Sequence, residues 1–130
     1  MPRPPLSELS FQTQSTPFYS LPHIQPRRIV HTIAGVPTVA GHRDGQLGVA
    51  LLHSPAGIVA ASLDAQVVYI ADTANHVLRC LTQSSLTTVA GVPGTAGFID
   101  GPLAEATFSA PTGLAVLPDG RLLVADTHNN

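Results

Sequence analysis

From residue 29 onward, short runs of apolar residues alternate with turn residues along most of the chain. The run at 67–71 is rich in β-branched and aromatic residues, and clusters of glycine, proline, aspartate and asparagine separate such runs. There is no long amphipathic helical pattern. The pattern therefore predicts an all-β chain with strands near residues 29–34, 56–61, 67–71, 76–81, 86–90, 112–117 and 121–125.

Four of these strands, within 56–90, are predicted to form one antiparallel unit. Its first strand lies in 55–62, a continuous small and apolar run typical of a strand buried on both faces. A turn at 63–66 leads to the second strand, and the turn at 72–75 follows it. There the Asp and Thr side chains can cap backbone N–H groups, and Asn tolerates the left-handed conformation. A last turn at 82–85 precedes the outer strand, which completes one propeller-like blade.

The chain contains an internal repeat. Segment 32–45 recurs as 88–101 at an offset of 56 residues, and 13 of the 26 positions from residue 32 to residue 57 are identical between the copies. Beyond the first turn the offset falls to 54, and 70–76 corresponds to 124–130. A period of roughly 40 to 55 residues is typical of propeller blades. Because a closed ring typically needs about 4 to 8 blades, we expect one full blade with flanking partial blades, an incomplete ring whose remainder belongs to a longer chain.

Residues 1–28 differ from the repeat region at 29–130. Proline is interspersed there with serine, threonine and glutamine, and hydrophobic alternation is absent. This composition predicts a disordered leader. The chain has no apolar run of the length that a signal peptide or a membrane span requires, which favours an intracellular location and no membrane partner.

Residues 111–130 resemble the NHL repeat, a propeller-forming repeat with Pro-x-Gly before the inner strand, Asp-Gly in the first turn and Ala-Asp-x-x-Asn-His before the third strand. The earlier copy fits the same pattern, including Arg79, although 62–66 lacks the Asp-Gly turn and Val77 replaces the leucine of the family name. The resemblance implies a partial β-propeller of four-stranded antiparallel NHL-type blades. Its motif positions are Pro55, Gly57, Asp72, Asn75 and His76 in the first copy, and Pro111, Gly113, Asp126 and Asn129 in the second.

Asp72 and Asp126 occur once per repeat, each followed by threonine. Catalysis normally needs a unique and asymmetric set of groups, so repeated carboxylates are better interpreted as structural supports. The alternative is that some of them face a central channel and bind a divalent cation.

The sequence His42-Arg43-Asp44 resembles the catalytic loop of protein kinases, but Val49 stands where that loop needs asparagine. The second copy keeps only Asp-Gly of this segment, so Asp44-Gly45 and Asp100-Gly101 are predicted to be repeated turns.

No other motif indicates a reaction. The glycine-rich segment 91–97 lacks the Lys-Ser/Thr of a phosphate loop, and the histidines show no metal-ligand spacing. Cys80 is the single cysteine and is predicted to be a small buried hydrophobe in its strand. We therefore assign no catalytic, cofactor-binding or metal-binding residue.

The formal net charge of −2 gives no electrostatic footprint for nucleic acid. The resemblance implies a binding or scaffold module in preference to an enzyme, with protein as the expected partner. The alternative is a metal-dependent propeller enzyme, a lyase or a lactone-type hydrolase, whose site lies largely outside this chain.

Overall fold

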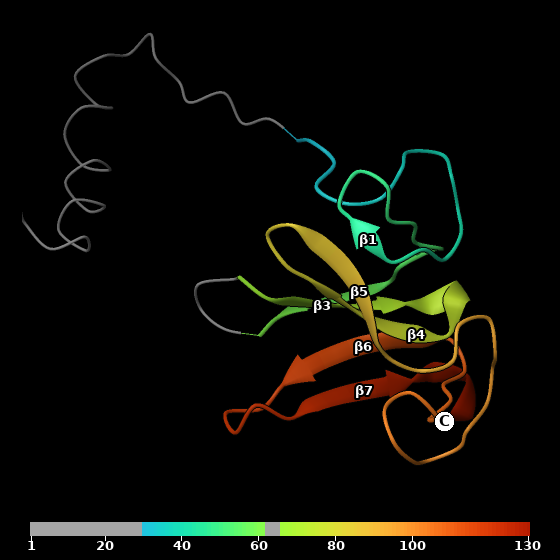
Figure 1. Ribbon diagram of the computed structural model, residues 1–130. Coiled ribbons are helices and arrows are strands. Elements are labelled where there is room, and N and C mark those ends of the chain that lie inside the picture. Colours follow the sequence, from blue (N-terminus) through green and yellow to red (C-terminus); the bar gives the residue numbers. More distant parts are fainter. Residues whose placement is uncertain (1–29, 62–65) are drawn as a thin grey trace, which may run out of the picture. The chain divides into compact units, whose positions relative to one another are not determined.

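The computed structural model describes residues 30–61 and 66–130, and residues 32–130 form one compact unit (Figure 1). The leader predicted at 1–28 and most of the turn predicted at 63–66 lie outside the described residues.

The larger of two sheets is antiparallel throughout and has the strand order β1-β5-β4-β3-β2. Strands β2 to β5 are neighbours in sequence as well as in space, so they form the predicted four-stranded meander. The strands of this sheet are β1 (Gly45–Gln46), β2 (Gly57–Ala60), β3 (Val68–Asp72), β4 (Val77–Leu81) and β5 (Ser85–Ala90).

The second sheet contains β6 (Pro111–Val116) and β7 (Leu122–Asp126), and lies against the first (Figure 1). A one-turn 3-10 helix follows the second strand of each copy, η1 (Thr73–Asn75) after β3 and η2 (Thr127–Asn129) after β7. The unit β2-β3-η1 therefore recurs as β6-β7-η2, and the fold is a partial all-β propeller. None of the helical elements in the described residues is long and apolar enough to cross a bilayer.

Six of the seven predicted strands are confirmed, each to within one residue at either end. The strand predicted near 29–34 is wrong, since residues 30–34 are irregular. The counterparts of residues 32–34 in the second copy, 88–90, belong to β5, which pairs with β4 on one side and β1 on the other. No ladder among the described residues includes 30–34, so the same β-forming sequence has no backbone partner there.

The turn predicted at Asp44-Gly45 is also wrong for Gly45, which begins β1. Gly45 lies opposite Leu86 and Gln46 lies opposite Ser85, so the linker before the blade adds a fifth strand to its outer edge. A two-residue strand between turn residues carries no period-2 signal, and the sequence pattern could not reveal it.

β2 is not buried on both faces as predicted. Its residues alternate between half-buried and exposed, and the side chain of Ile58 is 69% exposed. One face of β2 lies close to β6, where a Cβ atom added to Gly57 would lie 1.8 Å from the carbonyl oxygen of Thr112. The other face, which carries Ile58, has no neighbouring strand among the described residues.

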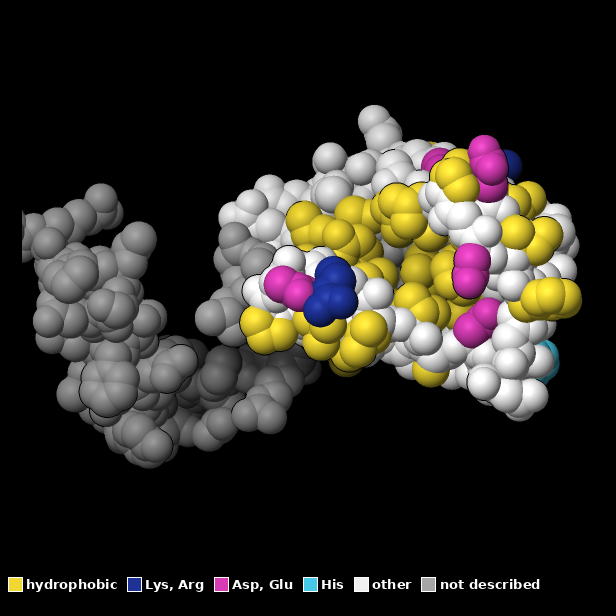
Figure 2. All heavy atoms as spheres, turned by 90° about the horizontal axis from the view of Figure 1, so that it is seen from below, with side chains coloured by type: hydrophobic (Ala, Val, Ile, Leu, Met, Phe, Trp, Pro, Cys, Tyr) yellow, Lys and Arg dark blue, Asp and Glu magenta, His cyan; other side chains and the backbone are white. Residues whose placement is uncertain are grey.

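Two apolar clusters cover the two faces of the larger sheet. The first contains buried Ala50, Ile70 and Leu86, with Leu52, Val68 and Leu81 packed against them. The second contains buried Ala71, Leu78 and Ala90, with Val89, Phe108, Leu114, Leu122 and Val124 packed against them. The linker before β2 contributes Ala50 to the first cluster, and the linker before β6 contributes Phe108 to the second. Each linker therefore packs on one face of the larger sheet. Figure 2 shows hydrophobic side chains gathered around a recess on the lower side of the molecule.

Candidate functional site

Three residues of the repeat signature in the first copy, Asp72, Asn75 and Arg79, meet in a buried polar cluster. Asp72 and Arg79 are fully buried and Asn75 is nearly so. The Oδ1 atom of Asp72 accepts a hydrogen bond from the backbone N–H of His53 at 2.8 Å. Its Oδ2 atom accepts from Asn75 Nδ2 at 2.8 Å and from Arg79 Nη1 at 2.7 Å. Asp72 was predicted to accept hydrogen bonds from backbone N–H groups, and its backbone donor is His53, 19 positions upstream in the linker beside β3.

Arg79 joins the blade to the linker that precedes it. Its Nη1 also donates to the carbonyl oxygen of Leu51 at 2.9 Å, and its Nη2 donates to the carbonyl oxygen of Arg43 at 3.0 Å and to Asp44 Oδ1 at 2.8 Å. A guanidinium group carries five N–H donors in a rigid, planar arrangement. In Arg79 the two Nη nitrogens donate to four acceptors, two each. The Nε atom is buried without a partner in the described part of the chain. Sequence reasoning noted Arg79 only as part of the repeat signature and missed this central position.

The residue in the left-handed conformation is His76, with φ of 58°, and not Asn75 as predicted. Asn75 instead uses its amide as a donor, to Asp72 and to the carbonyl oxygen of Gly41 at 2.8 Å. His76 ends the 3-10 turn, and its Nδ1 accepts a hydrogen bond from the backbone N–H of Ala110 at 3.0 Å. The histidine of the motif therefore links the two copies.

The second copy repeats most of this arrangement. Asp126 Oδ1 accepts from the backbone N–H of Ser109 at 2.6 Å, and Asn129 Nδ2 donates to Asp126 Oδ2 and to the carbonyl oxygen of Gly97. Unlike Asp72, Asp126 is only half-buried, and no arginine of the described residues contacts it. The two aspartates are equivalent as backbone acceptors but not as ion-pair partners.

The Pro-x-Gly motif lies where the two copies meet. The residues before the prolines, Ser54 and Ala110, have φ of 50° and 53°. Pro111 is buried and its carbonyl oxygen accepts a hydrogen bond from Thr73 Oγ1 at 2.7 Å, whereas Pro55 is exposed. Gly113 has a looser environment than Gly57, since its added Cβ would meet only the Cβ of Ala125 at 3.2 Å.

His42, Asp44 and Thr88 form a small exposed cluster at the edge of β5. His42 Nε2 lies 2.7 Å from Thr88 Oγ1, which donates to Asp44 Oδ1 at 2.9 Å, and the N–H of Thr88 donates to Asp44 Oδ2 at 3.0 Å. Because the Thr88 hydroxyl proton lies on the bond to Asp44, His42 donates to Thr88 and does not act on it as a base. The cluster fastens the linker to β5.

The pKa of Asp44 reflects opposing effects. Partial burial raises the pKa of this carboxyl, but the hydrogen bonds from Thr88 together with the charge and hydrogen bond of Arg79 outweigh burial, and the net pKa lies below the ordinary value of 3.8. Acid therefore has to protonate a carboxylate that the fold stabilises in its charged form.

We expect Asp44→Asn to flatten the loss of stability in acid. A carboxyl with a depressed folded-state pKa stabilises the fold above its unfolded-state pKa, and this contribution disappears as the pH falls from about 4 toward the folded-state pKa. Urea midpoints at pH 5 and pH 3 test this, and the wild type should lose more than the variant between the two. Equal losses in both proteins would contradict the pKa direction.

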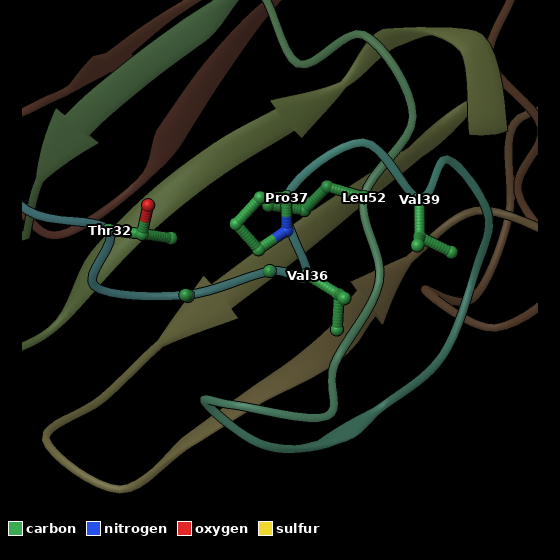
Figure 3. A pocket seen from close by; sticks show the side chains of 7 residues that line it. Thr32, Val36, Pro37, Val39 and Leu52 are labelled. Carbon is green, nitrogen blue, oxygen red and sulfur yellow. The ribbon is translucent and has the colours of Figure 1, made fainter.

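Outside these clusters the described residues offer little chemistry. No group of three His, Cys, Asp or Glu side chains in them could hold a metal ion. Cys80 is half-buried instead of fully buried, and burial raises the pKa of its thiol. An apolar pocket of about 180 Å³ lies where the loop at 34–39 folds over Leu52 (Figure 3). Its lining contains one hydroxyl side chain, that of Thr32, so it has no group for acid or base chemistry.

The chain is similar to several known proteins. The pattern of the NHL repeat matches residues 108–130. Protein SUPPRESSOR OF QUENCHING 1, chloroplastic, from Arabidopsis thaliana is 41% identical over 92 residues, which make up 69% of this chain and 8% of that protein. NHL repeat-containing protein 2 from Gallus gallus is 39% identical over 67 residues, which make up 50% of this chain and 8% of that protein. The chain thus spans less than a tenth of the length of either relative.

Solved structures share the same arrangement of strands. An auxiliary nutrient binding protein from Bacteroides thetaiotaomicron VPI-5482 is 30% identical with a TM-score of 0.66, over 75% of this chain and 26% of that protein. An auxiliary nutrient binding protein from Bacteroides ovatus ATCC 8483 is 27% identical with a TM-score of 0.66, over the same 75% and 26%.

Proposed function

We propose that this chain, which belongs to the NHL-repeat family of β-propellers, is part of a binding module whose partner is a protein. The proposed contact surface is the linker end of the blades, which we define as residues 41–43, 53 and 74 of the first copy and residues 97–99, 109 and 128 of the second. Backbone hydrogen bonds join these segments within each copy.

The main support for this proposal is that equivalent positions of the two copies make the same backbone hydrogen bonds but have different side chains. The N–H of Gly41 donates to the carbonyl oxygen of Leu52 at 3.1 Å, and the N–H of Gly97 donates to the carbonyl oxygen of Phe108 at 3.0 Å. Similarly, Ala74 donates to His53 at 3.1 Å and His128 to Ser109 at 3.0 Å. The two copies therefore hold the same main-chain positions although their side chains differ.

The side chains that differ are exposed. His42 and Arg43 of the first copy correspond to Phe98 and Ile99 of the second, and Phe98 is 82% exposed. A rigid frame lowers the ordering cost of binding, while arginine and aromatic side chains are enriched in protein interfaces. The aspartate and asparagine of the motif, which are the same in both copies, are instead occupied in hydrogen bonds to the backbone. Exposed side chains that differ between the copies, together with motif side chains already hydrogen-bonded within the fold, support a binding role over a catalytic one.

The choice of a protein partner has two supports. The net charge of −2 does not favour a polyanion such as nucleic acid. Exposed Phe98 and Ile99 of the second copy and exposed Arg43 of the first are side chains of the kinds suited to a protein surface with an apolar centre and a polar rim. Two of the similar solved structures are of auxiliary nutrient binding proteins, which is consistent with a binding role for such blades.

The test compares surface variants of the full-length protein. Arg43→Ser combined with Phe98→Ser should change stability by no more than about 0.5 kcal/mol, as is usual for exposed positions. Proteins that purify with the wild type are expected to be depleted several-fold with this variant when quantified by mass spectrometry.

Gln83→Ala is the matched control, because Gln83 is exposed in the turn between β4 and β5, away from the linker end. This variant should retain the partners. If both variants retain or both lose them, the linker end is not the contact surface.

A further inference from the structure

We infer that a pocket between the two linkers takes a tyrosine side chain of the protein partner. Three segments line this pocket: the linker before β2, the strand β5 and the linker before β6. The inference rests on the proposed binding role, since it names a side chain that the partner of the linker end would supply.

The lining of the pocket is apolar over one part and polar over another. Val89, Pro93, Leu103 and Ala104 belong to the apolar part, whereas the exposed cluster of His42, Asp44 and Thr88 supplies the polar part. The volume of the pocket is about 290 Å³. Sites for drug-sized molecules begin at about 300 Å³, so this pocket has room for one large side chain. A side chain with an apolar body and a polar tip matches such a lining.

The polar groups that remain available in the pocket are acceptors. The hydroxyl proton of Thr88 is already used, because it lies on the bond to Asp44 Oδ1. Asp44 Oδ2 accepts one hydrogen bond in the described part of the chain, from the N–H of Thr88 at 3.0 Å, and has a second lone pair. Since His42 donates through Nε2, its Nδ1 is an acceptor, and no described residue donates to it. The tip of the occupant therefore has to donate a hydrogen bond.

A neutral donor fits this position better than a charged one. Asp44 already has Arg79 as its ion-pair partner at 2.8 Å. An ammonium group would give up its water without an unpaired carboxylate to compensate it, and a carboxylate tip would be repelled by Asp44. Tyrosine carries a neutral O–H donor on an aromatic ring and is enriched in protein interfaces.

The first copy shows that this side of a linker stays open beside a four-stranded blade. Gly48 corresponds to Ala104, and Leu47 corresponds to Leu103. Gly48 is exposed, and a Cβ atom added to it would meet no atom within 4 Å, although β1 of the same linker pairs with β5. Leu47 is half-buried, so it keeps exposed surface too. Pairing between a linker and the outer strand of its blade therefore does not fill this position.

The pocket is continuous with the proposed contact surface. His42 belongs to the linker end and also lines the pocket. Both linkers are fixed to Asn75, which donates through Nδ2 to the carbonyl oxygen of Gly41 at 2.8 Å and accepts from the N–H of Gly94 at 2.9 Å. A preformed pocket lowers the ordering cost of binding, and aromatic anchors in such pockets dominate the affinity of many protein interfaces.

The test asks whether the full-length protein binds the isolated side chain of tyrosine, 4-methylphenol. Toluene has the same ring and methyl group without the donor, and butylammonium carries the donor of lysine on an alkyl chain. In titrations followed by saturation-transfer NMR, we expect 4-methylphenol to bind in the millimolar range and about fivefold more tightly than either of the others. The three ligands are compared on the wild type, so this result does not depend on how any variant folds.

Ala104→Trp places the site in the pocket. The indole would occupy the pocket from the linker before β6, and we expect it to weaken the binding of 4-methylphenol about tenfold or more. Glu105→Trp is the matched control, because it adds the same side chain at the exposed neighbouring position, which does not line the pocket. Both variants should unfold in urea as the wild type does. Proteins that purify with the wild type should be depleted several-fold with Ala104→Trp and retained with Glu105→Trp.

Four outcomes would overturn the inference. Equal binding of toluene would mean that apolar contact alone fills the pocket, and tighter binding of butylammonium would mean that it takes a lysine. Binding of 4-methylphenol that ignores Ala104→Trp would place the site elsewhere. If Ala104→Trp lost 4-methylphenol but kept all partners, no partner tyrosine would enter the pocket. Each of these outcomes leaves the linker end to its own test with Arg43→Ser and Phe98→Ser, so the two failures can be told apart.

Discussion

Arg79→Leu is expected to lower the free energy of unfolding by about 3 to 5 kcal/mol, the usual cost of removing one partner from a buried ion pair. Leucine would leave the carboxylate of Asp72, which has no exposed surface, without its cation. It would also remove the donors to the carbonyl oxygens of Leu51 and Arg43. Urea unfolding of the full-length protein, followed by circular dichroism, measures the loss.

Arg121→Leu is the matched control, because Arg121 pairs with Asp119 at 2.8 Å on the surface, where the side chains are 73% and 53% exposed. Exposed ion pairs contribute little to stability because solvent screens their charges, so the stability of this variant should be close to that of the wild type. Adding Asp72→Asn to Arg79→Leu should recover part of the loss, since asparagine removes the unpaired charge and keeps an acceptor for the N–H of His53. A similar loss for the Arg79 and Arg121 variants would contradict the role given to the buried cluster.

Gly57→Ala is expected to cost about 3 kcal/mol or more, at the upper end of the range for overpacking. The new Cβ would lie 1.8 Å from the carbonyl oxygen of Thr112, a backbone atom that cannot rotate away. β2 and β6 would have to separate, which would also loosen the contact between Thr73 Oγ1 and the carbonyl oxygen of Pro111. Thermal unfolding of the full-length protein measures the effect.

The equivalent substitution in the second copy, Gly113→Ala, should cost no more than about 1 kcal/mol, because its new Cβ would meet only a methyl group at 3.2 Å. A glycine that served only local strand geometry would give the same result at both positions. Equal effects of the two substitutions would therefore remove the close approach of β2 and β6 as the reason for Gly57.

The sequence predicted the parts of the fold that depend on local pattern. β3, β4 and β5 combine β-branched residues with turn residues at both ends, so their existence and order follow from neighbouring residues alone. The strand near 29–34 failed because strand formation needs a partner, and a residue pattern does not show whether one is present. β1 was missed for the opposite reason, since pairing with β5 imposes extended backbone on two residues of a linker.

The site was predictable only in outline. The repeat predicted Asp72 and Asn75 as structural residues, and both take part in hydrogen bonds within the buried cluster. It did not indicate that Arg79 connects them to Asp44, since these two residues are 35 positions apart in the sequence. Nor did it separate Asp72 from Asp126, because the difference lies in the arginine that faces the first and not in the motif itself.

The reach of Arg79 back to the preceding linker also decides where such a blade could be exchanged between proteins. A genetic crossover between Leu52 and Gly57 would separate the arginine from three of its four acceptors, those on Arg43, Asp44 and Leu51. A crossover near Gly91 would keep all four with it. We therefore expect the unit that is exchanged in this family to begin at the glycine that starts one linker and to end just before the glycine that starts the next, which here means from Gly35 to Ala90. Its ends differ from those of the four-stranded blade, which begins at β2.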